Sequence, residues 1–372
     1  MRIGFADFSS LDFHAQSVDS QPLGGTQSAA CYLARILARR GHEIFLFTHT
    51  STPGSFAGVK SLSWHSTPLS ALRPLQFDVF VCLLAATRGA LLRSALGPDT
   101  RLVLWTGHSF DQADVQDLHQ AGERQAYDDF VLVSEWQRDG FLRRFRLAPA
   151  RTHILRNAVA PSFENLFPDD TPILSAKARP PVIAYTSTPF RGLDLLLEAF
   201  PEIRAAVPGV RLRVFSSMSV YQMPRAADEA RHGRMYARCR EIEGVEYVGS
   251  LPQTLLAGEM RSVMALAYPN KFAETSCIAA LEAMASGCAV VTSALGALPE
   301  TTAGFARLVH FGAERQRYLS DFVEQITEAL RAGMRHDAQA EMLLRRQVGY
   351  IQANATWEAR AIEWEQWLGS KR

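Results

Sequence analysis

The feature that most limits how this chain can fold is an alternation of apolar runs and helix-like segments, which begins at residue 2, pauses once and begins again. The runs of the first half are rich in Val, Ile, Leu and Phe and lack regular polar alternation. Such runs are typical of strands in a parallel sheet that is buried on both faces. They read RIGFAD, HEIFLF, FDVFVCLLA, RLVLWTG, DDFVLVS and THILRNA, with a helix expected at about 26–40.

A polar, proline-bearing stretch at 167–181, FPDDTPILSAKARPP, interrupts the pattern and is the expected linker. The alternation then resumes with VIAYTS, a helix at about 192–207, and the runs VRLRVFSS, VEYVGS, VMALAYP and AVVTS. A chain of 372 residues is too long for one ordinary core and about right for two. The sequence therefore predicts an α/β protein with two Rossmann-like layered domains.

The last expected helix, at about 354–368, carries three tryptophans on one stripe, Trp357, Trp364 and Trp367. We expect this stripe to pack the helix back onto the first domain. The predicted domains are therefore residues 1–160 together with 352–372, and residues 161–351.

Composition narrows the class of protein further. Hydrophobic residues make up 47% and charged residues 21%, as in a soluble globular protein, and a formal net charge of +1 offers no bulk field to attract nucleic acid. No run approaches the roughly 20 apolar residues that span a bilayer. MRIGFADF leads straight into a strand without a signal peptide, so a cytoplasmic protein is expected. The cysteines are widely spaced without a CxxC pair, which indicates reduced core thiols; they are Cys31, Cys82, Cys239, Cys277 and Cys288.

A glycine pair, Gly24 and Gly25, precedes the first expected helix in LGGTQSAACYLARILARRG. Glycine lets the backbone approach a ligand closely, and a helix N-terminus offers free N–H groups to an anion, although a plain loop-to-helix turn would read the same. The GxGxxG, GxxxxGK[ST] and GxSxG motifs are absent from the sequence. Their absence argues against a dinucleotide dehydrogenase, a P-loop NTPase and an α/β-hydrolase.

Two other strand ends carry polar side chains. LVLWTGHSFDQ ends a strand with His108, whose imidazole could bond a sugar hydroxyl or a phosphate and be held by a carboxylate such as Asp111. An ordinary loop histidine is the alternative. No second histidine lies at metal-ligand spacing, so no metal site is expected.

VIAYTSTPFRG ends another strand with Ser187 and Thr188, and Arg191 and Gly192 then open a helix. Hydroxyls, an arginine and a helix N-terminus together suit a phosphate group. Simple helix capping with a solvated arginine is the alternative.

The segment FAETSCIAALEAMASGCAVV contains two carboxylates, Glu274 before an apolar helix and Glu282 inside it. Ser276 is the expected N-cap of this helix and Gly287 its end. No Lys, Arg or His occurs at 272–306, so both carboxylates are unpaired in the local sequence. Burying a bare carboxylate is costly unless hydrogen-bond donors are supplied, and vicinal hydroxyls such as those of ribose supply two.

Between the two glutamates, the backbone N–H groups near Ser276, Cys277 and Ile278 are expected to be free for a phosphate. A second set of hydroxyls could sit beside Glu274. Ribose, phosphates and a hexose in a row describe a nucleotide sugar.

On these residues the sequence resembles a GT-B glycosyltransferase of the retaining family 4 type. Glu274 and Glu282, followed by AMASGCAVVTS, match the paired glutamates of that family. RGLDLLLEAF resembles its phosphate-binding Lys-Gly segment, with Arg191 in place of the lysine, and TGH places His108 where the family has a cleft histidine. VSEWQRDGF, LRNAV and GGTQSA resemble segments of its first domain, so the likeness covers most of the chain.

The resemblance implies two Rossmann-like domains that face an interdomain cleft, the first on the acceptor side and the second binding a nucleotide sugar. Glu282 would hold the ribose, Arg191 the diphosphate and Glu274 the donor sugar, while His108 would line the reaction centre. The other donor-binding positions that the resemblance implies are Gly24, Gly25, Ser187, Thr188, Gly192, Thr275, Ser276, Cys277 and Ile278. It also implies sugar transfer with retained anomeric configuration, without a metal or another cofactor.

One departure concerns the diphosphate. The family usually has an arginine about five residues before its lysine, but this chain reads YTSTPFRG, where Arg191 alone is basic. Diphosphate binding is therefore expected to depend also on hydroxyls and backbone N–H groups.

Two other functions stay open at this point. A GT-B-like epimerase or phosphorylase would use a similar phosphate site, but a phosphorylase needs a lysine for pyridoxal phosphate late in the chain, where the last 60 residues contain only Lys371. A non-catalytic nucleotide-sugar-binding module is the third class. A single-turnover assay with donor and acceptor extracts separates such a module from an enzyme.

The acceptor of the sugar is expected to be a glycan, a lipid-linked molecule or a small molecule, and the sequence does not choose among them. SEWQRDGFLRRFRLAPAR, at 134–151, places arginines beside aromatic and aliphatic residues. This pattern fits either a peripheral contact with the inner membrane face or a solvated helix whose aromatics belong to the core.

Overall fold

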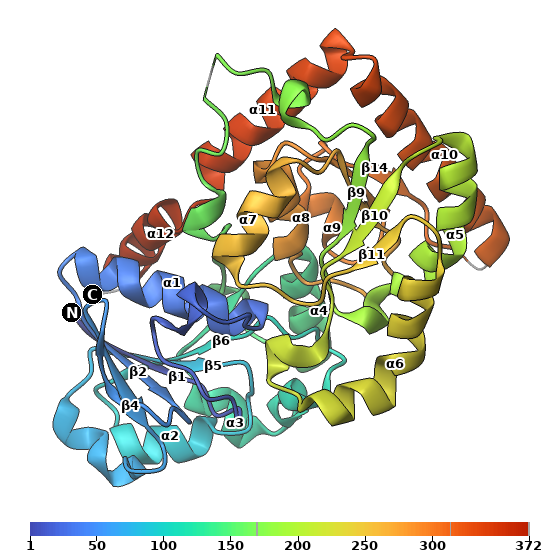
Figure 1. Ribbon diagram of the computed structural model, residues 1–372. Coiled ribbons are helices and arrows are strands. Elements are labelled where there is room, and N and C mark those ends of the chain that lie inside the picture. The colour runs from blue at the N-terminus through green and yellow to red at the C-terminus, as the bar shows by residue number, and fades with distance from the viewer. Residues whose placement is uncertain (169, 313, 371–372) are drawn as a thin grey trace. The chain divides into compact units, whose positions relative to one another are not determined.

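The computed structural model describes residues 1–168, 170–312 and 314–370. The chain forms two compact units, shown in Figure 1. Unit 1 is Met1–Ala158 together with Trp357–Arg372, and unit 2 is Val159–Thr356. The divisions expected from the sequence, at residues 160 and 351, lie a few residues from these positions.

Unit 1 is built on a mostly parallel sheet. Within its described residues the sheet has eight strands in the order β3-β4-β2-β1-β5-β6-β7-β8. Each run predicted as a strand in this half forms one of them, because the side chains of such strands are buried on both faces. The strands are β1 (Arg2–Ala6), β2 (Glu43–Thr48), β3 (Gly54–Phe56), β4 (Val59–Ser63), β5 (Val79–Leu83), β6 (Arg101–Trp105), β7 (Asp129–Leu132) and β8 (Thr152–Ile154).

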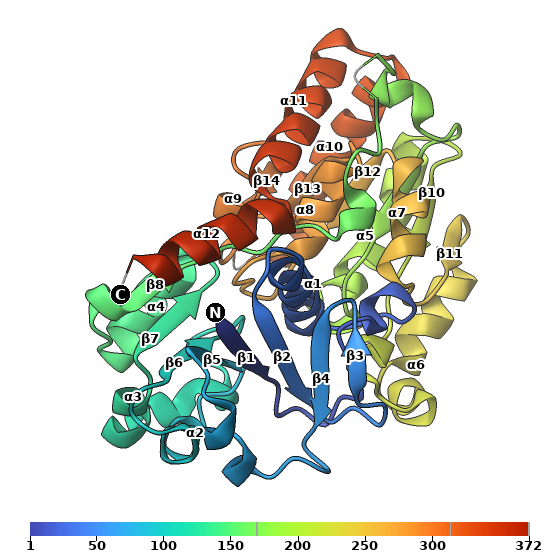
Figure 2. The ribbon, with the colours of Figure 1, turned by 90° about the vertical axis from the view of Figure 1, so that its left-hand side faces the viewer.

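One edge of this sheet differs from the prediction of a purely parallel sheet. β3 pairs with β4 in the antiparallel direction, and neither strand was expected from the sequence. They are joined by Ala57 and Gly58, which both have positive φ, as a tight hairpin turn requires (Figure 2). The parallel part of the sheet therefore begins at β4, which pairs with β2.

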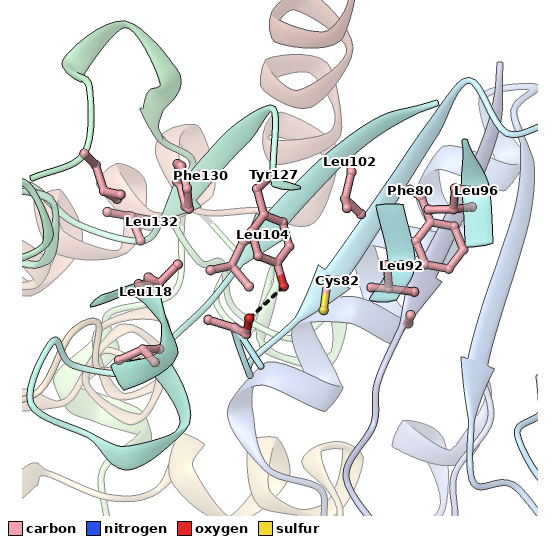
Figure 3. Packing of buried hydrophobic residues seen from close by; sticks show 14 of the residues in the cluster. Phe80, Cys82, Leu92, Leu96, Leu102, Leu104, Leu118, Tyr127, Phe130 and Leu132 are labelled. Atoms are coloured by element: carbon pink, nitrogen blue, oxygen red, sulfur yellow. Dashed lines mark hydrogen bonds between the residues drawn. The ribbon is translucent and has the colours of Figure 1, made fainter. Parts of the chain in front are cut away.

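A cluster of buried apolar side chains joins β5, β6 and β7 to the helices of unit 1 (Figure 3). Tyr127 lies within this cluster, and its hydroxyl donates to the carbonyl of Ala86 at 3.2 Å. The packing fixes the end of β6, where the loop with His108 begins. The helices of unit 1 are α1 (Gly25–Arg39), α2 (Gly89–Leu96), α3 (Ala121–Ala126), α4 (Glu135–Phe145) and α12 (Trp357–Gly369).

The return of the last helix to the first domain is confirmed, since α12 packs against α1 within unit 1 (Figure 1). Trp357 and Trp364 are each 1% exposed, and the ring of Trp364 lies 5.0 Å from that of Trp105. The ring of Trp367 lies 4.2 Å from the guanidinium of Arg101. The tryptophan stripe is therefore core packing.

Unit 2 contains a parallel sheet whose described strands follow the order β11-β10-β9-β12-β13-β14. They are β9 (Val182–Tyr185), β10 (Arg211–Val214), β11 (Val245–Tyr247), β12 (Ala265–Tyr268), β13 (Ala289–Ser293) and β14 (Arg307–Val309). The helices are α5 (Leu193–Ala206), α6 (Arg225–Glu241), α7 (Gln253–Arg261), α8 (Ile278–Ala285), α9 (Leu298–Thr301), α10 (Arg315–Met334) and α11 (Ala338–Asn354). The first five strands had been predicted, whereas β14 had not.

The stretch at 167–181 is packed into unit 2, so the prediction of a linker there was wrong. Ile173 and Leu174 are buried against α11. Glu341 of α11 accepts their backbone N–H groups at 2.7 and 2.8 Å. Polar and proline residues suggested a linker, but its few apolar side chains suffice to hold it on a helix.

Lys177 anchors the same stretch to two helix ends. Its ammonium is buried and donates to the carbonyl of Ser286 at 2.6 Å and to that of Arg261 at 3.1 Å. Ser286 follows α8 and Arg261 ends α7, where the helix dipole favours a positive charge. Burial lowers the pKa of Lys177. These contacts hold the amino-terminal end of unit 2 behind α8.

Among the helices that the structure describes, none has both the length and the apolar character needed to span a bilayer. The five cysteines are buried and unpaired, as expected of core thiols.

Candidate functional site

The strand order of unit 2 contains one point at which a ligand site is expected. From β9 the chain adds β10 and β11 on one side, and then places β12 on the other side of β9. The carboxyl ends of β9 and β12 therefore leave in opposite directions, and ligands of open α/β sheets bind at such a switch point. The loops after these two strands carry Arg191 and Glu274.

Arg191 and Glu274 meet at this switch point. Arg191 ends a short 3-10 helix, η8 (Pro189–Arg191), and its Nη1 donates to Glu274 Oε1 at 2.8 Å and to Oε2 at 2.9 Å. The guanidinium lies 4.6 Å from the centre of the Phe272 ring. Glu274 is therefore not unpaired, and this expectation was wrong because its cation lies 83 residues away in the sequence.

The environment of Arg191 keeps it charged. Burial would lower the pKa of Arg191, but the neighbouring Glu274 carboxylate raises it above its ordinary value. Glu274 itself is 3% exposed. The pair is thus a buried ion pair, in which removal of one partner would leave the other uncompensated.

Two hydroxyls extend the pair, and the sequence analysis had missed the first of them. Tyr268, the last residue of β12, donates its hydroxyl proton to Glu274 Oε1 at 2.6 Å. The Ser187 hydroxyl lies 3.2 Å from that of Tyr268. Burial raises the pKa of Tyr268, so its hydroxyl stays protonated as a donor. A tyrosine that ends an otherwise apolar strand was the signal in the sequence.

Two glycines let the backbone close around these side chains. Gly192 has a φ of +136°, and a Cβ there would lie 2.1 Å from the carbonyl oxygen of Pro269. Gly296, which the sequence analysis did not single out, has a φ of +60°, and its Cβ would lie 2.5 Å from the carbonyl oxygen of Glu274. Ala297 also donates its N–H to that oxygen at 2.7 Å. The backbone of Glu274 is therefore held in place.

The N-terminus of α8 lies directly after Glu274. The expected cap, Ser276, is wrong: Cys277 takes the N-cap position, and no side chain caps the helix. The N–H groups of Ala280 and Leu281 both donate to the Cys277 carbonyl at 3.2 Å. Thr275 and Cys277 are buried, whereas Ser276 and Ile278 are half-buried. An uncapped helix N-terminus can accept an anion.

Glu282 lies inside α8 and is 4% exposed. Its Oε1 atom has no hydrogen-bond partner among the described residues. Burial raises the pKa of Glu282 to about 8, and hydrogen bonding with Gln253 opposes this rise. Gln253 begins α7, and its own Oε1 is likewise buried without a partner in the part of the chain that the structure describes. Gln253 was missed because nothing in its local sequence marks it.

Other predicted residues lie at the ends of the same strands. Thr188 is 8% exposed, and its hydroxyl lacks a partner among the described residues. Its carbonyl accepts the hydroxyl of Tyr185 at 2.8 Å. The structure also adds a cation that the sequence analysis did not consider, Lys271, whose ammonium lies 2.8 Å from Asp194 Oδ2 on α5.

In unit 1, His108 follows β6 and is half-buried. Its Nδ1 atom lies 3.6 Å from Asp114 Oδ2, so the carboxylate beside it is Asp114 and the expectation of Asp111 was wrong. Burial lowers the pKa of His108, and the charges of Asp114 and Asp7 partly oppose this effect. The imidazole is therefore neutral near pH 7.

Gln137 fixes the loop that carries His108. It is fully buried at the start of α4, and its Nε2 donates to the carbonyls of Thr106 at 3.0 Å and His108 at 2.7 Å. Its Oε1 accepts the N–H of Val133 at 2.7 Å. The sequence analysis quoted Gln137 in VSEWQRDGF but gave it no role.

The glycine pair lies near the same loop. Gly24 is the N-cap residue of α1 and Gly25 its first residue, and Gly24 has an ordinary φ of −58°. Its backbone therefore does not need glycine for a left-handed conformation. A Cβ on Gly107 would lie 3.1 Å from the hydroxyl of Thr26, so the start of α1 and the His108 loop are neighbours. Among the described residues no group of three or more His, Cys, Asp or Glu side chains could hold a metal ion.

The two units together have the fold of GT-B glycosyltransferases, as comparison with solved structures shows. Sucrose-phosphate synthase from Thermosynechococcus elongatus superposes with a TM-score of 0.72 at 18% identity, covering 100% of this chain and 98% of that one. Anabaena HepE in complex with UDP-glucose gives a TM-score of 0.66 at 13% identity, with both chains covered completely.

Sequence comparison then identifies the domain. Residues 180–332, which contain Arg191, Glu274 and Glu282, match the family model of the glycosyl transferases group 1. The chain thus carries a glycosyl transferases group 1 domain on a GT-B fold. One of the subunits of phosphatidylinositol N-acetylglucosaminyltransferase from Arabidopsis thaliana is 24% identical over 320 residues. That match covers 74% of this chain and 66% of the relative.

Proposed function

We propose that this protein is a retaining glycosyltransferase that moves a sugar from a nucleotide-sugar donor to a hydroxyl acceptor without a metal ion. The observation that carries the proposal is Glu282, a buried carboxylate with an unpartnered oxygen beside a helix N-terminus and an arginine. A site of this kind suits ribose hydroxyls and phosphates together. A solved relative of the same fold binds UDP-glucose, which supports the same class of donor.

In this proposal each part of the donor has a partner in unit 2. Glu282 accepts hydrogen bonds from the ribose hydroxyls, and Arg191 and the N–H groups at the start of α8 bind the diphosphate. Glu274 lies where the donor sugar would follow. The bond between the anomeric carbon and the diphosphate oxygen breaks, a bond to the acceptor oxygen forms, and the acceptor hydroxyl loses its proton. Arg191 and the N–H groups stabilise the charge that develops on the leaving diphosphate.

The experiment that tests this proposal is a thermal-shift panel of UDP-, GDP-, ADP- and dTDP-sugars. At least one donor is expected to raise the melting temperature of the wild type, because a ligand that binds the folded state stabilises it. A single-turnover assay with that donor and acceptor extracts, with and without a chelator, then tests transfer and the absence of a metal requirement. No shift with any donor would contradict the proposal.

Glu282 gives donor binding a specific pH dependence. With a pKa of about 8 the empty site holds a neutral acid at pH 7, whereas ribose hydroxyls donate better to the ionised form. Donor binding therefore releases a proton, and affinity is expected to rise about tenfold from about pH 7 to about pH 9 and then to level off. Isothermal titration calorimetry at several pH values measures this rise.

The matched variant is Glu282→Gln, which fills the same space but cannot ionise. Its donor affinity is expected to stay flat over this pH range and to fall below that of the wild type as the pH rises. The variant should also fold, since an amide fits the same volume. Wild-type affinity that does not change with pH, or a variant that follows the wild-type curve, would remove Glu282 from the ribose site.

The acceptor side of the proposal rests on α4. The structure assigns the aromatics of this stretch to the core, because Phe141 and Phe145 are buried. Arg143, Arg144 and Arg146, by contrast, are exposed, and no ion pair involves them within the described residues. We propose that this arginine patch makes a peripheral contact with anionic lipid or with a lipid-linked acceptor at the cytoplasmic side of a membrane.

Vesicle binding tests the arginine patch. The wild type is expected to bind vesicles that contain acidic lipid, with each arginine contributing roughly 1 kcal/mol, and to release them as salt is added. The triple variant Arg143→Gln/Arg144→Gln/Arg146→Gln should lose most of this binding. Flotation assays measure it, and equal binding to neutral vesicles, or none to either kind, would contradict the proposal.

A further inference from the structure

The carboxylate of Glu274 is surrounded by hydrogen-bond donors from its own unit. It accepts from Arg191 Nη1 with both oxygens, and Tyr268 adds a hydroxyl to one of them. We propose that Glu274 and Tyr268 act as positioning residues, which orient Arg191 so that its opposite edge binds the diphosphate of the donor. This inference rests on the proposed function.

The guanidinium of Arg191 is divided between two tasks by its geometry. A guanidinium has five N–H groups in a rigid fork, and two on Nη1 are taken by Glu274. The Nε atom is buried without a hydrogen-bond partner among the described residues. Nε and Nη2 form the edge that donates two parallel hydrogen bonds to a phosphate. The edge turned away from Glu274 is therefore the one that lacks an acceptor.

The surroundings hold this orientation from several sides. The guanidinium lies over the Phe272 ring at 4.6 Å and near the Phe190 ring at 5.7 Å, which restricts its plane. The Arg191 carbonyl accepts the N–H of Lys271 at 3.1 Å. On the other side, the carbonyl of Glu274 accepts the N–H of Ala297. Both backbones are thus fixed, and the side-chain carboxylate is the remaining variable.

Tyr268 determines how that carboxylate is turned. Its hydroxyl donates to Oε1 at 2.6 Å, and the ring is buried at the end of β12. The Ser187 hydroxyl at 3.2 Å continues the chain of hydrogen bonds. Without the tyrosine hydroxyl the carboxylate loses one fixed donor and can rotate, and Arg191 would follow it. Tyr268 needs no contact with the donor to affect diphosphate binding in this way.

The test compares Tyr268→Phe with a matched control in the same unit, Tyr236→Phe. Tyr236 is also 1% exposed and donates its hydroxyl to a carboxylate, Asp228 Oδ1, at 2.7 Å. Both variants therefore lose the same kind of hydrogen bond and keep the ring. Calorimetry with UDP, GDP and ADP, and with the corresponding nucleosides, separates diphosphate binding from nucleoside binding.

For the diphosphate that binds the wild type most tightly, Tyr268→Phe is expected to raise the dissociation constant about tenfold, the equivalent of one hydrogen bond. The matching nucleoside should bind the variant and the wild type within about twofold of each other. Tyr236→Phe should change neither constant. An unchanged diphosphate constant in Tyr268→Phe, or equal losses for nucleoside and diphosphate, would overturn the positioning role.

A double-mutant cycle tests whether Tyr268 acts through Arg191. In the background Arg191→Ala the Tyr268→Phe change is expected to have no further effect on diphosphate affinity, because the group that it positions is gone. Fully additive effects would show that Tyr268 acts independently and would overturn the inference. If the wild type binds none of the nucleoside diphosphates, the proposed function fails and this inference fails with it; if it binds them and the cycle is additive, only the inference fails.

Discussion

His108→Ala is expected to lower turnover by roughly a hundredfold or more while donor affinity stays within about tenfold, the usual scale for a positioned acid–base or polarising group. The expectation comes from the place of His108 at the end of β6 and from its charge. Burial lowers the pKa of His108, so the neutral ring can accept or donate a hydrogen bond near pH 7. Gln137 holds its carbonyl, which fixes the loop independently of the imidazole. Loss of the ring should therefore leave the fold intact.

Paired measurements on the same variants test this expectation. Calorimetric donor binding and the transfer rate are compared for the wild type, His108→Ala and His108→Gln. Glutamine keeps a donor and an acceptor but does not titrate, so partial recovery in His108→Gln indicates polarisation and no recovery indicates proton transfer. Normal turnover in His108→Ala would move the reaction centre to other residues.

Arg191→Ala is expected to weaken binding of a nucleoside diphosphate by about 1.5–3 kcal/mol, the range for a hydrogen bond to a charged group. Binding of the bare nucleoside should barely change, because the proposed ribose partner is Glu282 on α8. The ratio of the two losses is the informative quantity. It separates an arginine that binds phosphate from one that merely supports the fold.

The fold itself needs a safeguard in this experiment, since Arg191→Ala leaves Glu274 as a buried charge without its cation. The double variant Arg191→Ala/Glu274→Gln removes that charge and keeps the volume of the side chain. Arg315→Ala is the control, because Arg315 also pairs with a glutamate of unit 2 but is 52% exposed. Equal losses of nucleoside and diphosphate affinity in the double variant would make Arg191 a structural residue.

The order of strands and helices was determined largely by local sequence. A strand of a parallel sheet must bury both faces, so β1, β2, β9 and β12 appear in the sequence as continuous apolar runs. The tryptophan stripe of α12 was readable in the same way, because helical periodicity is a local property. β3 and β14 escaped prediction because they are only three residues long and partly exposed.

The partners of the site residues were decided by the tertiary structure alone. Arg191 and Glu274 were both singled out from the sequence, but their ion pair joins loops that become neighbours only because β9 and β12 lie side by side in the sheet. Asp114 replaced Asp111 beside His108 because a 3-10 helix, η4 (Ala113–His119), turns the chain after β6. Local sequence carries the burial pattern of a strand, whereas the neighbour of a buried charge depends on strand order and loop direction, which no short stretch of sequence contains.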